Sequence, residues 1–171
     1  MRPHSWPFRT AVLTGPPRSG KSLLARWFAE SGAGAVIDDA HALDETALFH
    51  HWNRAQEEGT PLLMVAGEPP WRIGLPDLKS RLAAALQLEI GSPDQAMAED
   101  LLQVFAEQRG LSLGAEASAY LLPRAGRSWA DLERLVAAID RLSLERKVPA
   151  TLSIWRAALE AVHGPEEPRL L

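Results

Sequence analysis

The chain has 171 residues, of which 46% are apolar, and it contains no cysteine. This length suffices for one or two compact domains with a buried core. Without cysteine, neither a disulfide framework nor a thiolate metal site can form, which favours a reducing, cytoplasmic compartment. The formal net charge of −4 argues against nucleic-acid binding through a uniformly basic surface.

Membrane and targeting signals are not recognisable in the sequence. No apolar run approaches the length of about 18 residues that a membrane span requires. The first ten residues, MRPHSWPFRT, are too polar and too interrupted for a signal peptide. We therefore expect no membrane association, and we expect residues 165–171 to form a flexible tail.

The first half of the chain alternates predicted strands and helices. Short apolar runs predict strands at 10–14, 34–38, 61–67 and 86–90. Helical spacing predicts one helix to Glu30 and a second from an Asp44 cap to Glu58, closed by Gly59. The second helix is expected to bury the face that carries Leu48, Trp52 and Ala55. This alternation predicts an α/β fold with a parallel sheet covered on both faces.

The pattern changes at Gly91, after which four helical segments and no strand are predicted. The sequence SPDQ at 92–95 is interpreted as a capping box with Pro93 at the first helical position. The apolar residues expected on one face of this helix are Met97, Leu101, Val104 and Phe105. We therefore predict an α/β unit over residues 1–90 and a helical unit over 91–164.

Three further helices complete the predicted helical unit. One covers 115–122, before Pro123. The next begins at Ser128, and its expected core face carries Leu132, Leu135, Val136, Ile139 and Leu142. The last helix begins at Thr151 and stops at Gly164, which is followed by a proline.

Residues 15–22, GPPRSGKS, fit the phosphate-binding pattern G-x-x-x-x-G-K-[ST]. Glycines let backbone N–H groups curl around phosphate oxygens, and the N-terminus of the following helix adds a favourable dipole. Lys21 would reach the β- and γ-phosphates, and Ser22 would hold Mg²⁺. The residues predicted to bind ATP or ADP are Gly15, Pro16, Pro17, Arg18, Ser19, Gly20, Lys21, Ser22 and Leu23. A degenerate loop that no longer binds nucleotide is the alternative.

Two acids follow the second predicted strand. Asp38 ends an apolar run, as a Mg²⁺-coordinating acid of such a site requires, and Asp39 would orient an attacking water as a catalytic residue. The alternative is that both acids cap the next turn. His41, His50 and His51 are not spaced like a metal site and are expected at the surface.

Four stretches resemble the DnaA/Hda family of AAA+ proteins, and most closely its short Hda-like branch without the DNA-binding domain. They are GPPRSGKSLLARWFAE, AVIDDAHALDETALFHHWNRAQEEGTPLLMVAGEPP, GLPDLKSRLAAALQLEI and DLLQVFAEQRGLSLGAEASAYLLPRAGRSWADLERLVAAIDRL. The proline pair followed by LPDLKSRL is more specific than the phosphate-binding loop alone. The resemblance implies an AAA+ nucleotide-binding unit and a small helical lid.

The resemblance also implies a function and partners. Proteins of the Hda branch are regulators that act with the DNA-loaded sliding clamp and promote hydrolysis of ATP bound to DnaA. Arg81 matches the arginine finger of the family, which stabilises charge at the γ-phosphate in a neighbouring subunit's site. The family's DNA-reading domain would follow the lid, where this chain ends, so direct DNA binding is not expected. A homo-oligomer is left open.

The sequence departs from the family in the first unit. Only 15 residues separate Ser22 from Asp38, where the family places another strand and helix. We therefore predict a four-stranded sheet that lacks one edge strand. The family's polar sensor after the third strand is replaced by apolar Val65 and Ala66 and by Gly67, with Glu68 as a displaced substitute.

Two further departures concern the lid and the N-terminus. Trp129 and Ala130 stand where the family has a sensor arginine, so weak or absent hydrolysis by this chain itself is expected. The family's clamp-binding peptide begins with glutamine near the N-terminus, whereas the first glutamine here is Gln56. Trp6 and Phe8 are the only hydrophobic anchors in the first ten residues.

Two other functions stay open from the sequence. One is an interaction module of the same fold with an unused nucleotide pocket, which the substituted sensors favour. The other is a small-molecule kinase of the phosphate-binding-loop type, with Arg124 and Arg127 as lid arginines. The kinase interpretation leaves the segment LPDLKSRL unexplained.

Overall fold

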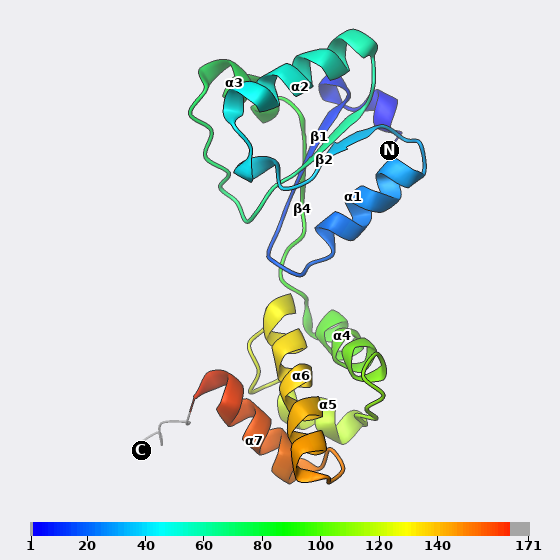
Figure 1. The fold of residues 1–171 in the computed structure, drawn as a ribbon, viewed down its shortest axis with the longest axis vertical. Helices are drawn as coiled ribbons and strands as arrows, with labels where there is room; N and C mark the ends of the chain where they lie inside the picture. Colours follow the sequence, from blue (N-terminus) through cyan, green and yellow to red (C-terminus); the bar gives the residue numbers. More distant parts are fainter. Residues whose placement is uncertain (1, 165–171) are drawn as a thin grey trace. The chain divides into compact units, whose positions relative to one another are not determined.

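The computed structural model describes residues 2–164 of the chain, and the predicted tail at 165–171 lies outside these described residues. The chain divides into two compact units between Gly91 and Ser92 (Figure 1). The sequence-based division placed Gly91 in the second unit. The first unit is α/β and the second is helical.

A four-stranded parallel sheet forms the centre of the first unit, in the order β2-β3-β1-β4. Its strands are β1 (Thr10–Thr14), β2 (Ala35–Ile37), β3 (Leu62–Val65) and β4 (Leu86–Glu89). The predicted four-stranded sheet is thus confirmed. Three of the strands are shorter than predicted, because Gly34, Pro61, Ala66 and Ile90 lie outside the paired register. β2 is an edge strand, as expected from the short connection that precedes it.

Helices cover both faces of this sheet (Figure 1). One face packs against α1 (Lys21–Glu30), and the other packs against α2 (Glu45–Glu58) and α3 (Pro76–Ala83). Successive residues of a strand point to opposite faces, so Leu63 joins the α1 cluster while Leu62 joins the α2 and α3 cluster. The predicted core face of α2 is confirmed, since Leu48, Trp52 and Ala55 are all buried.

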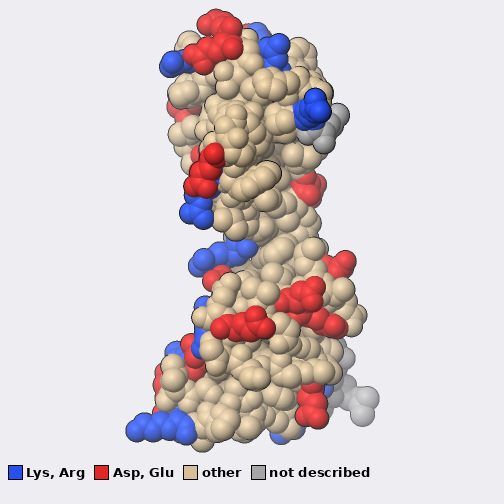
Figure 2. Space-filling model, turned by 90° about the vertical axis from the view of Figure 1, so that its right-hand side faces the viewer, with Lys and Arg blue, Asp and Glu red and all other residues tan. Residues whose placement is uncertain are grey.

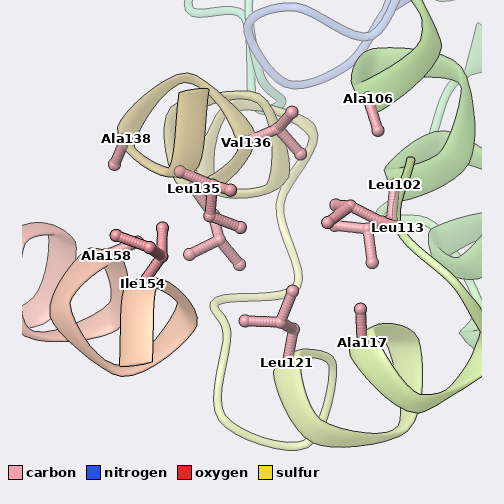
Figure 3. Packing of buried hydrophobic residues seen from close by; sticks show 11 residues of the cluster. Leu102, Ala106, Leu113, Ala117, Leu121, Leu135, Val136, Ala138, Ile154 and Ala158 are labelled. Atoms are coloured by element: carbon pink, nitrogen blue, oxygen red, sulfur yellow. The ribbon is translucent and has the colours of Figure 1, made fainter. Parts of the chain in front are cut away.

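The helical unit contains α4 (Gln95–Glu107), α5 (Ala115–Leu121), α6 (Trp129–Arg146) and α7 (Leu152–His163). Their apolar faces meet in one cluster, which includes Leu102 of α4, Leu121 of α5, Leu135 of α6 and Ile154 of α7 (Figure 3). The predicted core face of α6 is confirmed, since Leu132, Leu135, Val136 and Ile139 are buried. Leu142 is partly buried against the cluster. The four predicted helices are all present.

The predicted start of α4 was wrong, and its predicted core face was right only in part, since Phe105 packs against the cluster. The cap is Asp94, whose Oδ1 accepts the N–H of Met97 at 2.8 Å, and the capping box from Ser92 does not form. The buried residues are Ala98, Leu102 and Ala106, whereas Met97 and Val104 are each 45% exposed. Small alanines let α4 approach α6 closely, so the core stripe does not coincide with the bulkiest residues.

Candidate nucleotide-binding site

The phosphate-binding loop connects β1 to α1 and is fixed by backbone contacts at its start. Gly15 has φ +154°, and a side-chain carbon at this position would lie 2.7 Å from the carbonyl oxygen of Ile90. The Gly15 N–H donates to the carbonyl of Gly67 at 3.2 Å. Only glycine fits here, because the loop passes so close to the residue that follows β4.

The end of the loop forms the N-terminus of α1. Gly20 has φ +84° and occupies the cap position without a side-chain hydrogen bond to the helix. The first-turn N–H groups are therefore not occupied by a capping side chain, which suits an anion. Arg18, with φ +66°, completes the turn of the backbone in the middle of the loop.

Lys21 points back into the loop. Its Nζ donates to the carbonyl oxygens of Gly15 and Pro16, both at 2.7 Å. Burial lowers the pKa of the Lys21 ammonium below its ordinary value, while the carboxylates of Glu68, Asp38 and Asp39 act in the opposite direction. The charge of Lys21 is therefore influenced by the two predicted acids and by the displaced acid after β3.

Two serines of the loop differ in their surroundings. The Oγ of Ser19 is buried and has no hydrogen-bond partner among the described residues, whereas Ser22 in the first turn of α1 is exposed. A buried hydroxyl without a partner costs free energy. An oxygen-rich ligand in the loop would relieve that cost, so the residues present fit a phosphate group.

Asp38 and Asp39 follow β2 and are both exposed. Asp39 adopts a left-handed backbone conformation with φ +49°, and its N–H donates to Oδ1 of Asp38 at 3.0 Å. Neither carboxylate caps α2, because Asp44 caps that helix and accepts the N–H of Ala47 at 2.9 Å. Oδ1 of Asp38 therefore accepts a hydrogen bond within the turn after β2, and Oδ2 takes no part in that bond.

The other positions singled out from the sequence lie close by. Val65 and Ala66 are buried, and Gly67 contributes its carbonyl to the loop, so these three residues present no polar side chain. His41 is exposed, as predicted, and its ring lies beside Gly67. Within residues 2–164, no group of three or more His, Cys, Asp or Glu side chains could hold a metal ion by itself.

The side chain of Arg81, on α3, lies over two aromatic rings of α2. Its guanidinium carbon lies 4.5 Å from the ring centre of Trp52 and 5.1 Å from that of Phe49. Glu45 accepts the N–H groups of Gly74 and Leu75 at 2.9 and 2.5 Å, which fixes the start of α3. Helical residues four and three positions apart share a face. The spacing of Glu45, Phe49 and Trp52 is the sequence signal that places these side chains on one face of α2.

The two N-terminal aromatic residues differ in accessibility. Trp6 stacks on Phe28 with ring centres 5.5 Å apart and packs against the α1 side of the core. Phe8 is 55% exposed and its ring centre lies 6.3 Å from that of Trp52. Of the two hydrophobic anchors considered from the sequence, Trp6 is therefore part of the fold.

Residues 94–159 match the family described as the Hda lid domain. The helical unit is therefore similar to the lid domain of Hda over most of its described length. The chain is similar to an uncharacterized protein of Haemophilus influenzae, with 29% identity over 118 residues, covering 67% of this chain and 51% of that protein. The chain therefore spans about half the length of that curated relative.

Solved structures of AAA+ proteins share the fold of this chain. The Holliday junction branch migration motor RuvB of Thermotoga maritima has a TM-score of 0.68 at 16% identity, covering 92% of this chain and 64% of RuvB. Katanin has a TM-score of 0.66 at 21% identity, covering 93% and 73%. The initiator DnaA, bound to AMPPCP and single-stranded DNA, has a TM-score of 0.63 at 16% identity, covering 84% and 59%. No helix among the described residues is long and apolar enough to cross a membrane.

Proposed function

We propose that this protein is an Hda-like regulator of replication initiation that binds ATP or ADP and acts on DnaA through protein contacts in the cytoplasm. The observation that carries the proposal is the combination of an intact phosphate-binding loop with a segment that matches the Hda lid domain. The loop supplies a lysine and a helix N-terminus without a side-chain cap, and two acids follow β2 close to that lysine. The lid match favours the Hda branch over other AAA+ proteins.

In this proposal, residues 15–23 bind the phosphates of the nucleotide. Lys21 exchanges its two carbonyl partners for phosphate oxygens, and Ser22 with Asp38 would hold Mg²⁺. A bound Mg²⁺ would neutralise phosphate charge. Asp39 would orient water, but the apolar side chains of Val65 and Ala66 give it no polar partner after β3. We therefore infer weak or no hydrolysis by this chain itself.

Arg81 is the proposed contribution to a partner's site. The guanidinium carbon of Arg81 lies over two aromatic rings, and a cation–π contact leaves N–H groups that can donate to a phosphate. By this proposal Arg81 stabilises the charge that develops on ATP bound to DnaA. The sliding clamp remains a proposed partner, with Phe8 as the exposed aromatic residue near the N-terminus.

Nucleotide binding is tested by calorimetry with ATP and ADP in the presence of Mg²⁺. We expect Lys21→Ala to weaken binding by about 100-fold or more, because charge-assisted hydrogen bonds to phosphate are among the strongest in proteins. Lys147→Ala, at the end of α6, is the matched control and should bind as the unaltered chain does. Equal affinity of Lys21→Ala and the unaltered chain would contradict the proposed site.

Action on DnaA is tested by the hydrolysis rate of ATP bound to DnaA, measured with and without this protein and the DNA-loaded clamp. We expect Arg81→Ala to reduce any stimulation by about 10³-fold or more, the usual range for an arginine finger. Arg72→Ala, an exposed arginine before α3, is the control. Full stimulation by Arg81→Ala would contradict the proposed role of Arg81 as an arginine finger. It would leave the proposed nucleotide site unaffected.

An interaction module with an unused pocket is the second candidate. The observation that favours it is that Lys21 already has two hydrogen bonds within its own loop. In that case calorimetry gives no heat with either nucleotide, while binding to DnaA persists.

A further inference from the structure

A groove of about 690 Å³ lies within the helical unit. Its walls are the first half of α4, α5 and the turn that precedes α6. Of its apolar lining residues, Ala119 is exposed and Leu122 is partly exposed, whereas Ala98 and Leu132 are buried. A volume of this size accommodates a large side chain together with its neighbours in a bound segment.

Charged side chains line the same groove. Asp94, Glu99 and Asp100 contribute three carboxylates, and Arg127 contributes the one guanidinium. Asp94 is engaged as the cap of α4, and Glu99 accepts a 3.4 Å hydrogen bond from Gln95. Within residues 2–164, no hydrogen bond or ion pair engages the carboxylate of Asp100. The groove therefore combines an apolar lining with an acidic group that is available to a ligand.

The charge of the surrounding surface has the same sign. Residues 92–122 contain five acidic residues and one basic residue, namely Asp94, Glu99, Asp100, Glu107 and Glu116 against Arg109. Acidic side chains gather on the side of the helical unit that carries α4 (Figure 2). A ligand that approaches this side meets a negative potential, which attracts cations and repels nucleic acid.

We propose that this groove docks an exposed segment of a partner protein in which a large apolar side chain is flanked by Lys or Arg. The apolar side chain enters between α4 and α5, and its flanking cation pairs with Asp100. Apolar anchors in concave pockets dominate interface energetics, while charges at the rim fix orientation. The site lies wholly in the helical unit and is independent of the nucleotide proposal.

The test uses the full chain and a fluorescein-labelled peptide, acetyl-Lys-Arg-Leu-Trp-Arg-Lys-amide, with binding followed by fluorescence anisotropy. We expect Asp100→Asn to weaken binding about threefold to fivefold, the effect of one accessible ion pair. Glu107→Gln removes the same charge from α4 outside the groove and should change the affinity by less than about twofold.

The apolar contact is tested separately. Ala119 is exposed and lines the groove, so Ala119→Trp should fill it and abolish peptide binding while the helical circular dichroism signal is kept. A peptide with Gly-Gly in place of Leu-Trp should bind at least about tenfold more weakly, the effect of losing a buried anchor.

Three results would overturn the proposal. Equal weakening by Asp100→Asn and Glu107→Gln would mean unspecific attraction to an acidic surface. Unchanged binding of the Gly-Gly peptide would remove the apolar anchor. Phenethylguanidinium binding as tightly as the peptide would assign the groove to a small organic cation.

Discussion

The two units differ in how their buried polar groups are satisfied. In the helical unit, eleven buried apolar residues form one cluster, and both buried serines have partners. Ser143 donates to the carbonyl of Val148 at 2.7 Å, and Ser118 accepts from Gln103 at 3.2 Å. Each unit also contains one buried tryptophan N–H without a partner among the described residues, so the tryptophans do not distinguish the units.

In the α/β unit, a buried hydroxyl without a partner and a partly desolvated ammonium both lie in the phosphate-binding loop. The Ser19 hydroxyl lacks a partner, and burial depresses the pKa of the Lys21 ammonium a few residues away. Both features cost folding free energy. Both units are stabilised by packed apolar clusters, and the α/β unit in addition carries a polar cost at the phosphate-binding loop.

The largest effect is expected from the packed cluster. Leu135 of α6 is fully buried, so Leu135→Ala should lower the free energy of unfolding by about 3 kcal/mol through lost apolar burial and a cavity. Leu144 lies on the same helix but is 71% exposed, and Leu144→Ala should leave stability nearly unchanged. Urea unfolding followed by circular dichroism measures both, and equal losses would break the contrast between core and surface of α6.

A smaller effect is expected from the loop backbone. In Gly15→Ala the new methyl group would meet the carbonyl of Ile90, so we expect a loss of about 2 kcal/mol together with weaker nucleotide binding. Gly114 is the matched control in the helical unit, because a methyl group there meets open space. Gly114→Ala should change stability by less than about 1 kcal/mol. Thermal unfolding of the two variants measures this difference. Equal stability of Gly15→Ala and the unaltered chain would contradict the close contact between the loop and Ile90.

The smallest effect concerns the cap of α6. The Ser128 hydroxyl donates to Oδ2 of Asp131 at 2.7 Å and holds the pKa of that carboxyl below its ordinary value of 3.8, with Arg134 acting in the same direction. Because the folded state binds the Asp131 proton more weakly, this stabilisation is present above pH 3.8 and is lost as the pH falls through the lowered value.

Ser128→Ala removes that donor and the helix cap, so it should lower stability by about 1 kcal/mol at neutral pH. The loss should shrink as the pH falls below the ordinary Asp131 value. Unfolding midpoints measured between pH 7 and about pH 2 give this profile. A loss that stays constant over the whole range would show that Asp131 is not involved.

The sequence predicted the features that depend on local rules. The caps at Asp44 and Ser128 and the turn at Gly59 follow from residue chemistry near helix ends. The four-stranded sheet followed from the 15 residues between Ser22 and Asp38, which leave no room for another strand and helix. The resemblance of the helical unit to the Hda lid was confirmed by the match at 94–159.

Features that depend on tertiary packing could not be read in the same way. The bulky residues of α4 indicated its core face only in part: Phe105 packs against the cluster, but close helix contact favours Ala98 and Ala106 over Met97 and Val104. The aromatic rings that hold Arg81 lie on another helix, about 30 positions earlier in the chain. The roles predicted for Asp38, Asp39 and Arg81 remain predictions, since they depend on groups that this chain alone does not supply.

The hydrogen bonds of Lys21 to Gly15 and Pro16 have a consequence for exchange kinetics. A phosphate that enters the loop must break two 2.7 Å bonds before it can take over the lysine. Under the proposed nucleotide binding, the apparent affinity would be reduced by the fraction of time the ammonium is retained by the carbonyls. The loop would thereby compete with its own ligand for the lysine.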